Sequence, residues 1–250
     1  MDVTELKIKI FADGADVEMM LRLRQLPLIK GFTTNPTLMR KGGVSDYKGF
    51  ALRVLESITE EPVSFEVFSD DFAEMEDQAL EISSWGSNVN VKIPITNTQG
   101  KHCGECVHRL ARAGVKLNVT ALMTLDQVKT VAPALTACSS AYVSVFAGRI
   151  ADTGRDPVPA MQEIVEYLKA YPMVELIWAS PRELLNIFQA DAIGCHVITV
   201  NYDVLDRLRL VGKDLSEYSL ETVKMFHDDA RKAGYTLPSR TRTVRINAGS

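Results

Sequence analysis

Strand-like and helix-like segments alternate along this chain, and this alternation restricts its fold more than any other feature of the sequence. Eight segments are short, rich in β-branched residues and bounded by turn residues, as strands are. The longer segments between them carry apolar residues at helical spacing. The predicted strands are Leu6–Phe11, Gly31–Pro36, Pro62–Phe68, Asn88–Thr96, Val115–Leu122, Ala141–Ala147, Met173–Ala179 and Cys195–Asn201. The predicted helices are Val17–Leu26, Asp46–Thr59, Asp71–Ser84, Gly100–Ala113, Leu125–Ala137, Pro157–Ala170, Arg182–Gln189, Val204–Val211 and Leu220–Ala233.

Eight strands that alternate with helices predict parallel βα units, and eight such units close into a barrel. The 250 residues suit one such domain, and no linker or low-complexity segment interrupts them. An open, doubly wound sheet is the alternative, but the glycine-rich turn expected after its first strand is missing. We predict a single α/β domain, a (β/α)8 TIM barrel with an additional C-terminal helix, over residues 1–237. A flexible basic tail would follow over residues 238–250.

Composition and charge limit the functional classes. Hydrophobic residues make up 46% of the chain, and a formal net charge of −4 gives no indication of a nucleic-acid or membrane-surface protein. No apolar run approaches the roughly 18 residues of a membrane span, and the N-terminal residues lack the apolar centre of a signal peptide. We therefore expect a cytoplasmic protein that binds neither nucleic acid nor membrane.

Two of the four cysteines, Cys103 and Cys106, lie between His102 and His108 in a pattern similar to that of a metal site. The predicted helix would place both thiols on one face. No second group of ligands follows, and a chain of this length does not need disulfides for stability. We expect free thiols and no metal; a zinc or redox role is the alternative.

Lys92 lies in the predicted strand Asn88–Thr96, where Val89, Val91 and Ile93 alternate with polar residues. If the β-branched face packs against apolar structure, Lys92 points to the opposite, enclosed side. Burial disfavours the charged form of lysine, and a neutral amine is a nucleophile for carbonyl carbon. The alternative is an edge-strand lysine whose amine reaches water.

Polar residues stand at the ends of nearly all the other predicted strands. In a barrel, active-site groups come from the C-terminal ends of the strands. Each residue alone has a structural explanation, because Asp13 or Ser180 could cap a helix and Asn35 could form a turn with Pro36. Their concentration at one rim favours a functional site. These residues are Asp13, Thr33, Asn35, Glu66, Asn118, Thr120, Ser144 and Ser180.

Two carboxylates and one lysine form a chemically coherent set. Asp13 and Glu66 can serve as acid and base while Lys92 forms a covalent bond. Arg149 and Arg182 follow the sixth and seventh strands and would supply positive charge for a substrate anion, since their planar guanidinium groups match phosphate oxygens. The alternative for each arginine is a surface ion pair.

Several local strings resemble the transaldolase family, and especially its short members, which include the fructose-6-phosphate aldolases. The most specific strings are Thr33-Thr34-Asn35-Pro36-Thr37 and Val91-Lys92-Ile93-Pro94. The supporting strings are Phe11-Ala12-Asp13, Ser64-Phe65-Glu66-Val67, Leu117-Asn118-Val119-Thr120-Ala121, Val143-Ser144-Val145-Phe146-Ala147-Gly148-Arg149-Ile150 and Ala179-Ser180-Pro181-Arg182. They occur in family order and span nearly the whole chain.

The resemblance implies a class I aldolase mechanism in a (β/α)8 barrel, with no metal or organic cofactor. Lys92 would form an iminium with the C2 carbonyl of a ketose phosphate, Asp13 would take the proton of the C4 hydroxyl, and Glu66 would act through a water held by Thr120. Hydroxyls of the dihydroxyacetone unit would contact Asn35, Asn118 and Ser144. The phosphate would contact Arg149, Ser180 and Arg182. Thr33 and Phe146 complete the implied substrate-binding set.

Two positions within the resemblance separate transfer from plain aldol cleavage. Transaldolases carry Glu on the third strand and Phe on the sixth, where the fructose-6-phosphate aldolases carry Gln and Tyr. Glu66 and Phe146 match the transaldolases. A phenyl ring, unlike a tyrosine hydroxyl, cannot donate a proton to the enamine. The expected activity is therefore transfer of a dihydroxyacetone unit between sugar phosphates, as from sedoheptulose 7-phosphate or fructose 6-phosphate.

Departures from the family pattern cluster around the expected anion site. Pro181 stands where the family has a larger residue, Ala147 replaces a valine, and Arg155 adds a third arginine after Arg149. A specialised class I aldolase or transaldolase acting on a modified ketose, such as a sulfonated sugar, therefore stays open. A non-catalytic sugar-phosphate-binding barrel is a further alternative.

The resemblance also implies a homo-oligomer, a pentamer or decamer, in which the helix Leu220–Ala233 is exchanged between neighbours.

Overall fold

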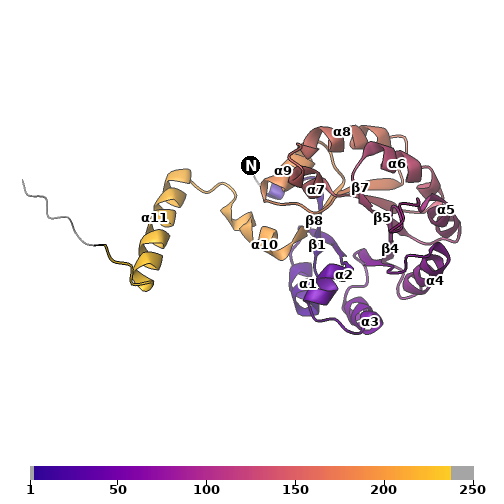
Figure 1. Cartoon of the computed structure of the whole chain (residues 1–250), viewed down its shortest axis with the longest axis horizontal. Helices are drawn as coiled ribbons and strands as arrows, with labels where there is room; N and C mark the ends of the chain where they lie inside the picture. The colour runs from indigo at the N-terminus through magenta and orange to yellow at the C-terminus, as the bar shows by residue number, and fades with distance from the viewer. Residues whose placement is uncertain (1–2, 238–250) are drawn as a thin grey trace, which may run out of the picture. The chain divides into compact units, whose positions relative to one another are not determined.

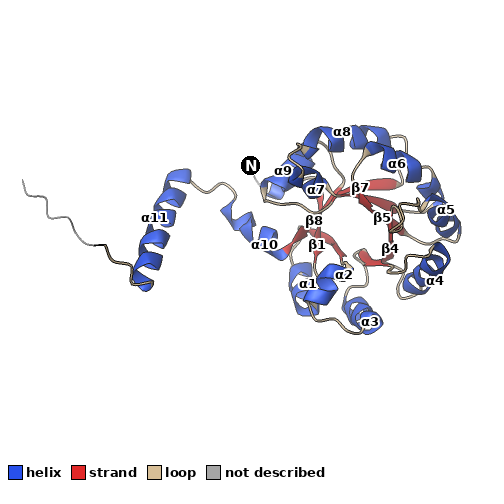
Figure 2. Cartoon of the chain, viewed as in Figure 1, coloured by secondary structure: helices blue, strands red, loops and turns tan. Residues whose placement is uncertain are grey.

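The computed structural model describes residues 3–237, in which eight parallel strands form a closed barrel in their order along the chain. Helices surround the strands (Figure 1 and Figure 2). This architecture confirms the predicted (β/α)8 fold. The strands are β1 (Lys9–Asp13), β2 (Ile29–Thr33), β3 (Val63–Glu66), β4 (Val89–Pro94), β5 (Leu117–Leu122), β6 (Ala141–Val145), β7 (Val174–Trp178) and β8 (Val197–Asn201).

The described helices correspond to the predicted ones with shifted ends, except that of the helix predicted over Val204–Val211 only Val204 and Leu205 are α-helical, and Asp206–Leu210 form a 3-10 turn. Two short helices, α2 and α7, were not predicted. The α-helices are α1 (Val17–Arg24), α2 (Pro36–Lys41), α3 (Tyr47–Ser57), α4 (Phe72–Ser83), α5 (Gly104–Arg112), α6 (Leu125–Val131), α7 (Ala147–Asp152), α8 (Pro157–Leu168), α9 (Leu185–Ala192), α10 (Tyr202–Leu205) and α11 (Leu215–Lys232). Three 3-10 turns are η1 (Val3–Glu5), η2 (Ala134–Ala137) and η3 (Asp206–Leu210).

Helix α2 begins where the sequence predicted the end of a strand. The Asn35 side chain accepts a hydrogen bond from the Leu38 backbone N–H at 2.9 Å, and Pro36 takes the first helical position, where no N–H is needed. Strand β2 therefore ends at Thr33, earlier than predicted. Helix α7 also begins where the sequence predicted the end of a strand, but without a side-chain cap, and its six residues are too few to show a helical period in the sequence.

Strand β1 begins and ends later than predicted, at Lys9 and Asp13. The backbone N–H groups of Lys7 and Ile8 donate to Asp191 Oδ1 at 2.8 and 2.9 Å, so they are not available to a neighbouring strand. At its other end, β1 stays paired with both β2 and β8 through Asp13. The later end matters because it brings a carboxylate to the C-terminal rim of the barrel.

Three predicted helix boundaries were also wrong. The helix predicted over residues 125–137 is divided into α6 and η2 around Pro133, which has no N–H to continue the helix. Helix α5 does not include Gly100, which has a left-handed φ of 77° and donates to the Asn97 carbonyl in a turn. Helix α11 begins earlier than predicted, at Leu215, because the Asp214 carboxylate caps its first turn.

The middle of the barrel interior is filled by an apolar cluster of Phe11, Tyr142, Ile177, Ala179 and Val197. Phe11 lies against Gly31, where an added Cβ would come within 2.7 Å of the Phe11 ring. The remaining core forms a layer between the strands and the helices. Side chains alternate along a strand, so the residue that follows Phe11 on the interior face of β1 is Asp13. Polar groups can thus gather at the C-terminal end of the barrel.

The chain divides into two compact units, the barrel up to Arg209 and a second unit that begins at Leu210. No residue of α11, in the second unit, is buried. The single domain over residues 1–237 stays a prediction, and the tail predicted for residues 238–250 lies outside the described residues. Within residues 3–237, no helix has both the length and the apolar character that crossing a bilayer requires.

Candidate active site

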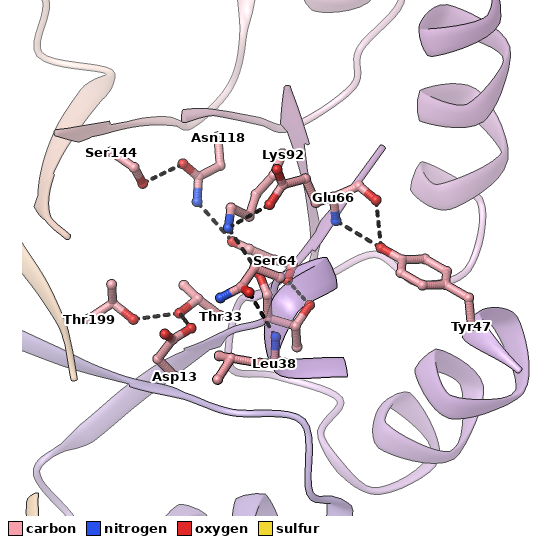
Figure 3. Close-up of polar contacts among 12 residues, drawn as sticks. Asp13, Thr33, Leu38, Tyr47, Ser64, Glu66, Lys92, Asn118, Ser144 and Thr199 are labelled. Atoms are coloured by element: carbon pink, nitrogen blue, oxygen red, sulfur yellow. Dashed lines mark hydrogen bonds and ion pairs between the residues drawn. The ribbon is translucent and has the colours of Figure 1, made fainter. Parts of the chain in front are cut away.

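Lys92 lies on β4 with its side chain inside the barrel, and only 6% of the residue is exposed. Its Nζ lies 3.0 Å from Glu66 Oε2 (Figure 3). It also donates to the Thr34 carbonyl oxygen at 2.9 Å. The sheet register explains the contact with the carboxylate, since Glu66 on β3 is directly opposite Lys92. The alternation of the sequence predicted this interior position of Lys92.

Asp13 is a second carboxylate at the same end of the barrel. Thr33 Oγ1 donates to Asp13 Oδ1 at 2.7 Å, and a short hydrogen bond links Thr33 to the Thr199 hydroxyl (Figure 3). Because the Thr33 hydroxyl donates its hydrogen bond to Asp13, Thr199 is the donor in the second bond. Burial raises the pKa of Asp13 above its ordinary value, although the charge of Lys92 and the Thr33 hydrogen bond oppose that effect. Asp13 is therefore a stronger base than a solvated aspartate.

A buried chain of hydrogen bonds crosses the barrel from β6 to β3. Ser144 Oγ donates to Asn118 Oδ1 at 2.7 Å, and Asn118 Nδ2 donates to Ser64 Oγ at 3.1 Å. Ser64 was not among the predicted site residues. On the same strand as Asn118, the buried Thr120 Oγ1 has no hydrogen-bond partner within residues 3–237. The Thr120 hydroxyl is consequently available to a bound molecule.

These side chains border a cavity of about 300 Å³ at the C-terminal end of the strands. Every predicted site residue lines it except Glu66 and Asn118, which contact the lining residues Lys92 and Ser144. The lining residues that the sequence analysis missed are Thr37, Leu38, Lys41, Ala179 and Thr199. The first three belong to α2, which was itself not predicted. Thr199 could have been identified as a site residue because it is a polar residue at an interior position of the eighth strand.

Asn35 both lines the cavity and caps α2, whereas the structural alternative for it was a turn with Pro36. Its Oδ1 is used by the cap, and its amide NH₂ group is left as a donor. The predicted strand-end asparagine thus fixes the start of the helix that carries Lys41 to the rim of the cavity.

Arg149 and Arg182 line the cavity with different partners. Arg182 Nε donates to Asp152 Oδ1 at 2.8 Å, Nη2 makes a second, short contact with Oδ2, and Nη1 donates to Ser180 Oγ at 3.0 Å. The Arg182 hydrogen bonds hold the pKa of Asp152 below its ordinary value. Arg149 lies over the Phe146 ring, 5.5 Å from its centroid, and has no ion pair among the described residues. Arginine stays charged in either setting, so the difference is that Asp152 lies within ion-pair distance of Arg182 and acts on Arg149 only at longer range.

Helix α7, which carries Arg149, touches the loop that carries Arg182 at Gly148 and Ser180. A Cβ added to Gly148 would lie 1.6 Å from the Ser180 carbonyl oxygen. Ser180 has a φ of 60°, in the left-handed region that favours glycine. This close approach of backbone to backbone brings Arg149 and Arg182 to the same side of the cavity.

The cysteine and histidine pattern places Cys103 at the N-cap of α5 and Cys106 within that helix. Cys103 and Cys106 are free and buried, and burial raises the pKa of each thiol to about 12. Both thiols are therefore protonated and unreactive at neutral pH. Within residues 3–237, no group of three or more His, Cys, Asp or Glu side chains is arranged to hold a metal ion.

Fold and cavity together define an α/β-barrel protein with an enzyme-type site, in which a buried lysine contacts a carboxylate at the strand ends. Sequence comparison agrees, because the transaldolase/fructose-6-phosphate aldolase family matches residues 10–237. A Dehalococcoides mccartyi protein named "Probable transaldolase" is 38% identical over 199 residues, which cover 79% of this chain and 88% of the relative. A Thermoanaerobacter protein of the same name is 34% identical over 91% of this chain and 99% of its own. The chain belongs to the transaldolase/fructose-6-phosphate aldolase family and is an enzyme of that family.

Solved structures of other enzymes share the fold. Dihydrodipicolinate synthase from Rhodopseudomonas palustris aligns with a TM-score of 0.56 at 15% identity, over 90% of this chain and 79% of that one. A 2,3-dimethylmalate lyase aligns with a TM-score of 0.51 at 11% identity, over 97% of this chain and 89% of that one. At these identities the likeness supports the barrel and says nothing about the reaction.

Proposed function

We propose that this enzyme is a transaldolase that transfers a dihydroxyacetone unit from a ketose phosphate to an aldose phosphate through a Schiff base on Lys92. Sedoheptulose 7-phosphate and fructose 6-phosphate represent the donor class. The observation that carries the proposal is the 3.0 Å contact between Glu66 Oε2 and the Nζ of Lys92, which lines the cavity together with Asp13. A buried amine beside a carboxylate suits covalent catalysis on a carbonyl carbon.

The first step is attack of the Lys92 amine on the C2 carbonyl of the donor. The amine must lose a proton to attack, and Glu66 is close enough to take it. The carbinolamine then loses its hydroxyl as water, with a proton returned by Glu66, and an iminium forms between Nζ and C2. The Thr120 hydroxyl, which has no protein partner in the described chain, would hold this water.

The second step breaks the C3–C4 bond. Asp13 takes the proton of the C4 hydroxyl, the electrons of the C3–C4 bond move to the iminium, and the aldehyde leaves. The enamine that remains on Lys92 has three carbons. The raised pKa of Asp13 makes it a better base for this hydroxyl than a solvated aspartate. Asn35, Asn118 and Ser144 would hold the hydroxyls of the bound unit.

The third step decides between transfer and release. The enamine adds to the carbonyl carbon of an acceptor aldose phosphate, Asp13 returns its proton to the new hydroxyl, and hydrolysis of the iminium frees Lys92. Release of dihydroxyacetone needs a proton donor at the enamine carbon instead. Phe146, which lines the cavity, has no hydroxyl to give one. This position favours transfer.

The phosphate would be bound by Arg149, Ser180 and Arg182. A second candidate, a transaldolase or aldolase for a modified ketose such as a sulfonated sugar, is favoured by one observation. Asp152 pairs with Arg182 through both carboxylate oxygens and offsets its charge. A site in which Asp152 offsets part of the charge of the two arginines suits a sulfonate, which carries a single negative charge.

Borohydride trapping tests these proposals. Wild-type protein would be incubated with each of several ketoses, phosphorylated, sulfonated and uncharged, and then reduced. True donors are expected to leave a reduced three-carbon adduct on Lys92, measured by mass spectrometry, and Lys92→Met serves as the blank. A panel of acceptor aldehydes then identifies the second substrate. Binding of sugar phosphates without an adduct from any ketose would show a non-catalytic sugar-phosphate-binding barrel.

The protein is further proposed to form a homo-oligomer, a pentamer or decamer, through α11. The support is that large apolar side chains of this helix are exposed, among them Leu215, Val223 and Phe226 at 80%, 59% and 63%. Analytical ultracentrifugation of the full chain checks this assembly, and a monomer at micromolar concentration would refute it.

A further inference from the structure

The Tyr47 hydroxyl holds the backbone of Glu66 at two points. Its oxygen accepts a hydrogen bond from the Glu66 N–H at 2.9 Å and donates one to the Glu66 carbonyl oxygen at 2.7 Å (Figure 3). Tyr47 is the first residue of α3, and Glu66 is the last residue of β3. A helix residue thus supplies both hydrogen bonds that a neighbouring strand would ordinarily give to the end of β3.

The ladder between β2 and β3 shows why a strand cannot supply them. The Phe32 N–H donates to the Pro62 carbonyl at 2.8 Å and the Thr34 N–H donates to the Ser64 carbonyl at 3.1 Å. Parallel ladders advance by two residues on each strand. The next bond would run from residue 36 to the Glu66 carbonyl, and residue 36 is a proline, which has no N–H.

The same ladder would pair the Glu66 N–H with the Thr34 carbonyl oxygen. That oxygen instead accepts the hydrogen bond from Lys92 Nζ at 2.9 Å. Because Tyr47 satisfies the Glu66 N–H, the Thr34 carbonyl is available to the lysine. The tyrosine therefore affects both partners of Lys92. It holds the backbone of Glu66, which carries the carboxylate, and it replaces the bond from the Glu66 N–H that would otherwise occupy the Thr34 carbonyl oxygen.

Aromatic neighbours fix the position of this hydroxyl. The Tyr47 ring makes edge-to-face contacts with Phe65 and Phe68, at centroid distances of 6.5 and 5.6 Å, and a tilted contact with Trp85 at 5.8 Å. Burial raises the pKa of the Tyr47 hydroxyl far above the neutral range. The hydroxyl consequently stays protonated and can donate to the Glu66 carbonyl at any working pH.

We propose that Tyr47 is a positioning residue for the reaction: it fixes Glu66 against Lys92 and leaves the Thr34 carbonyl oxygen to accept from the lysine. Tyr47 does not line the cavity and acts only through Glu66 and Thr34. This inference rests on the proposed Schiff-base function. Its consequence is that loss of one hydroxyl outside the cavity slows iminium formation without weakening donor binding.

The test is Tyr47→Phe, which keeps the aromatic contacts and removes the hydroxyl. Single-turnover mixing with the best ketose donor, quenched with borohydride at increasing times, gives two separate quantities. The rate constant reports iminium formation at each competent site, and the final amplitude counts those sites. We expect a rate constant lower by about tenfold, as for a small misplacement of a catalytic group, an unchanged amplitude and a donor KM within about twofold of wild type.

Tyr167→Phe is the matched control, because its hydroxyl bonds only Tyr171 among the described residues, at 3.1 Å, away from the cavity. It is expected to match the wild type in both quantities. A lower amplitude with an unchanged rate constant in Tyr47→Phe would show a merely structural role and overturn the proposal. An unchanged rate constant with full amplitude would overturn it as well.

Phe68→Ala decides the matter if Tyr47→Phe does not fold. Phe68 is 65% exposed, so its truncation leaves the core intact while removing one contact that steadies the Tyr47 ring. We expect a rate constant lower by about twofold at full amplitude, and an unchanged rate constant would overturn the proposal.

Absence of any adduct in the wild type would overturn the proposed function together with this inference. An adduct in the wild type with equal rates in the variants overturns this inference alone.

Discussion

Arg182 is held by Asp152 through both oxygens of the carboxylate at the rim of the cavity. The hydrogen bond from Nε to Oδ1 is 2.8 Å long, and the second contact, from Nη2 to Oδ2, is shorter. Arg149, on the same side, has no such partner among the described residues. Two arginines that look equivalent in the sequence therefore differ in how closely a carboxylate offsets their charge.

Asp152→Asn tests this difference. The asparagine keeps the shape of the side chain and removes its charge, so the rim becomes more positive. Inorganic phosphate, used as a competitive inhibitor, is expected to show an inhibition constant lower by about threefold at low salt, with the gain lost at about 1 M salt. A higher inhibition constant would show instead that Asp152 serves mainly to orient Arg182.

Asp13→Asn separates carbon–carbon bond cleavage from Schiff-base formation. Because Asp13 acts in the second and third steps and not in the first, borohydride should still trap the intact donor on Lys92. Multiple turnover is expected to fall by about a hundredfold or more, the contribution of a general base. Loss of the trapped adduct would place Asp13 in the first step.

The pH dependence of turnover follows from the raised pKa of Asp13. Below that pKa the carboxyl is protonated and cannot accept the C4 hydroxyl proton. The rate is therefore expected to fall as the pH falls through a value above the ordinary aspartate range.

Thr33→Val tests this assignment, because it removes the hydrogen bond that stabilises the carboxylate. The pKa of Asp13 then rises further, and the acid limb of the pH profile, where the rate falls, moves to higher pH. Thr199→Val keeps that bond and is the control; an acid limb at the same pH in Thr33→Val would refute the assignment to Asp13.

Much of this site could be predicted from local pattern. A period of two residues determines which side chains of a strand face inward, and this was sufficient to place Lys92, Glu66 and Asn118 inside the barrel. The sheet register then brings Glu66 opposite Lys92 without further information. These positions are settled by backbone geometry, which repeats regularly along the sequence.

Contacts between distant side chains could not be predicted in this way. Tyr47 meets Glu66 from 19 residues away, and Asp152 meets Arg182 from 30 residues away, with no periodic signal in either case. Helix α2 was missed because the short run from Pro36 has too few residues to show a period. With α2, the cationic residue Lys41 was missed as well.

Gly148→Ala tests the close approach that assembles the anion side of the cavity. The new Cβ would lie 1.6 Å from the Ser180 carbonyl oxygen, so either α7 or the loop at Ser180 must move. We expect the free energy of unfolding to fall by about 1–3 kcal/mol, as for overpacked sites, with a Tm lower by about 2–4 °C for each kcal/mol. The KM for a phosphorylated donor should rise more than the KM for an uncharged ketose, because Arg149 and Arg182 separate.

Gly104→Ala is the matched control. Gly104 lies in α5, where the nearest atom to an added Cβ is 3.9 Å away, and the Tm of this variant should equal or exceed that of the wild type. Equal losses for charged and uncharged donors would show that the contact serves stability rather than anion binding.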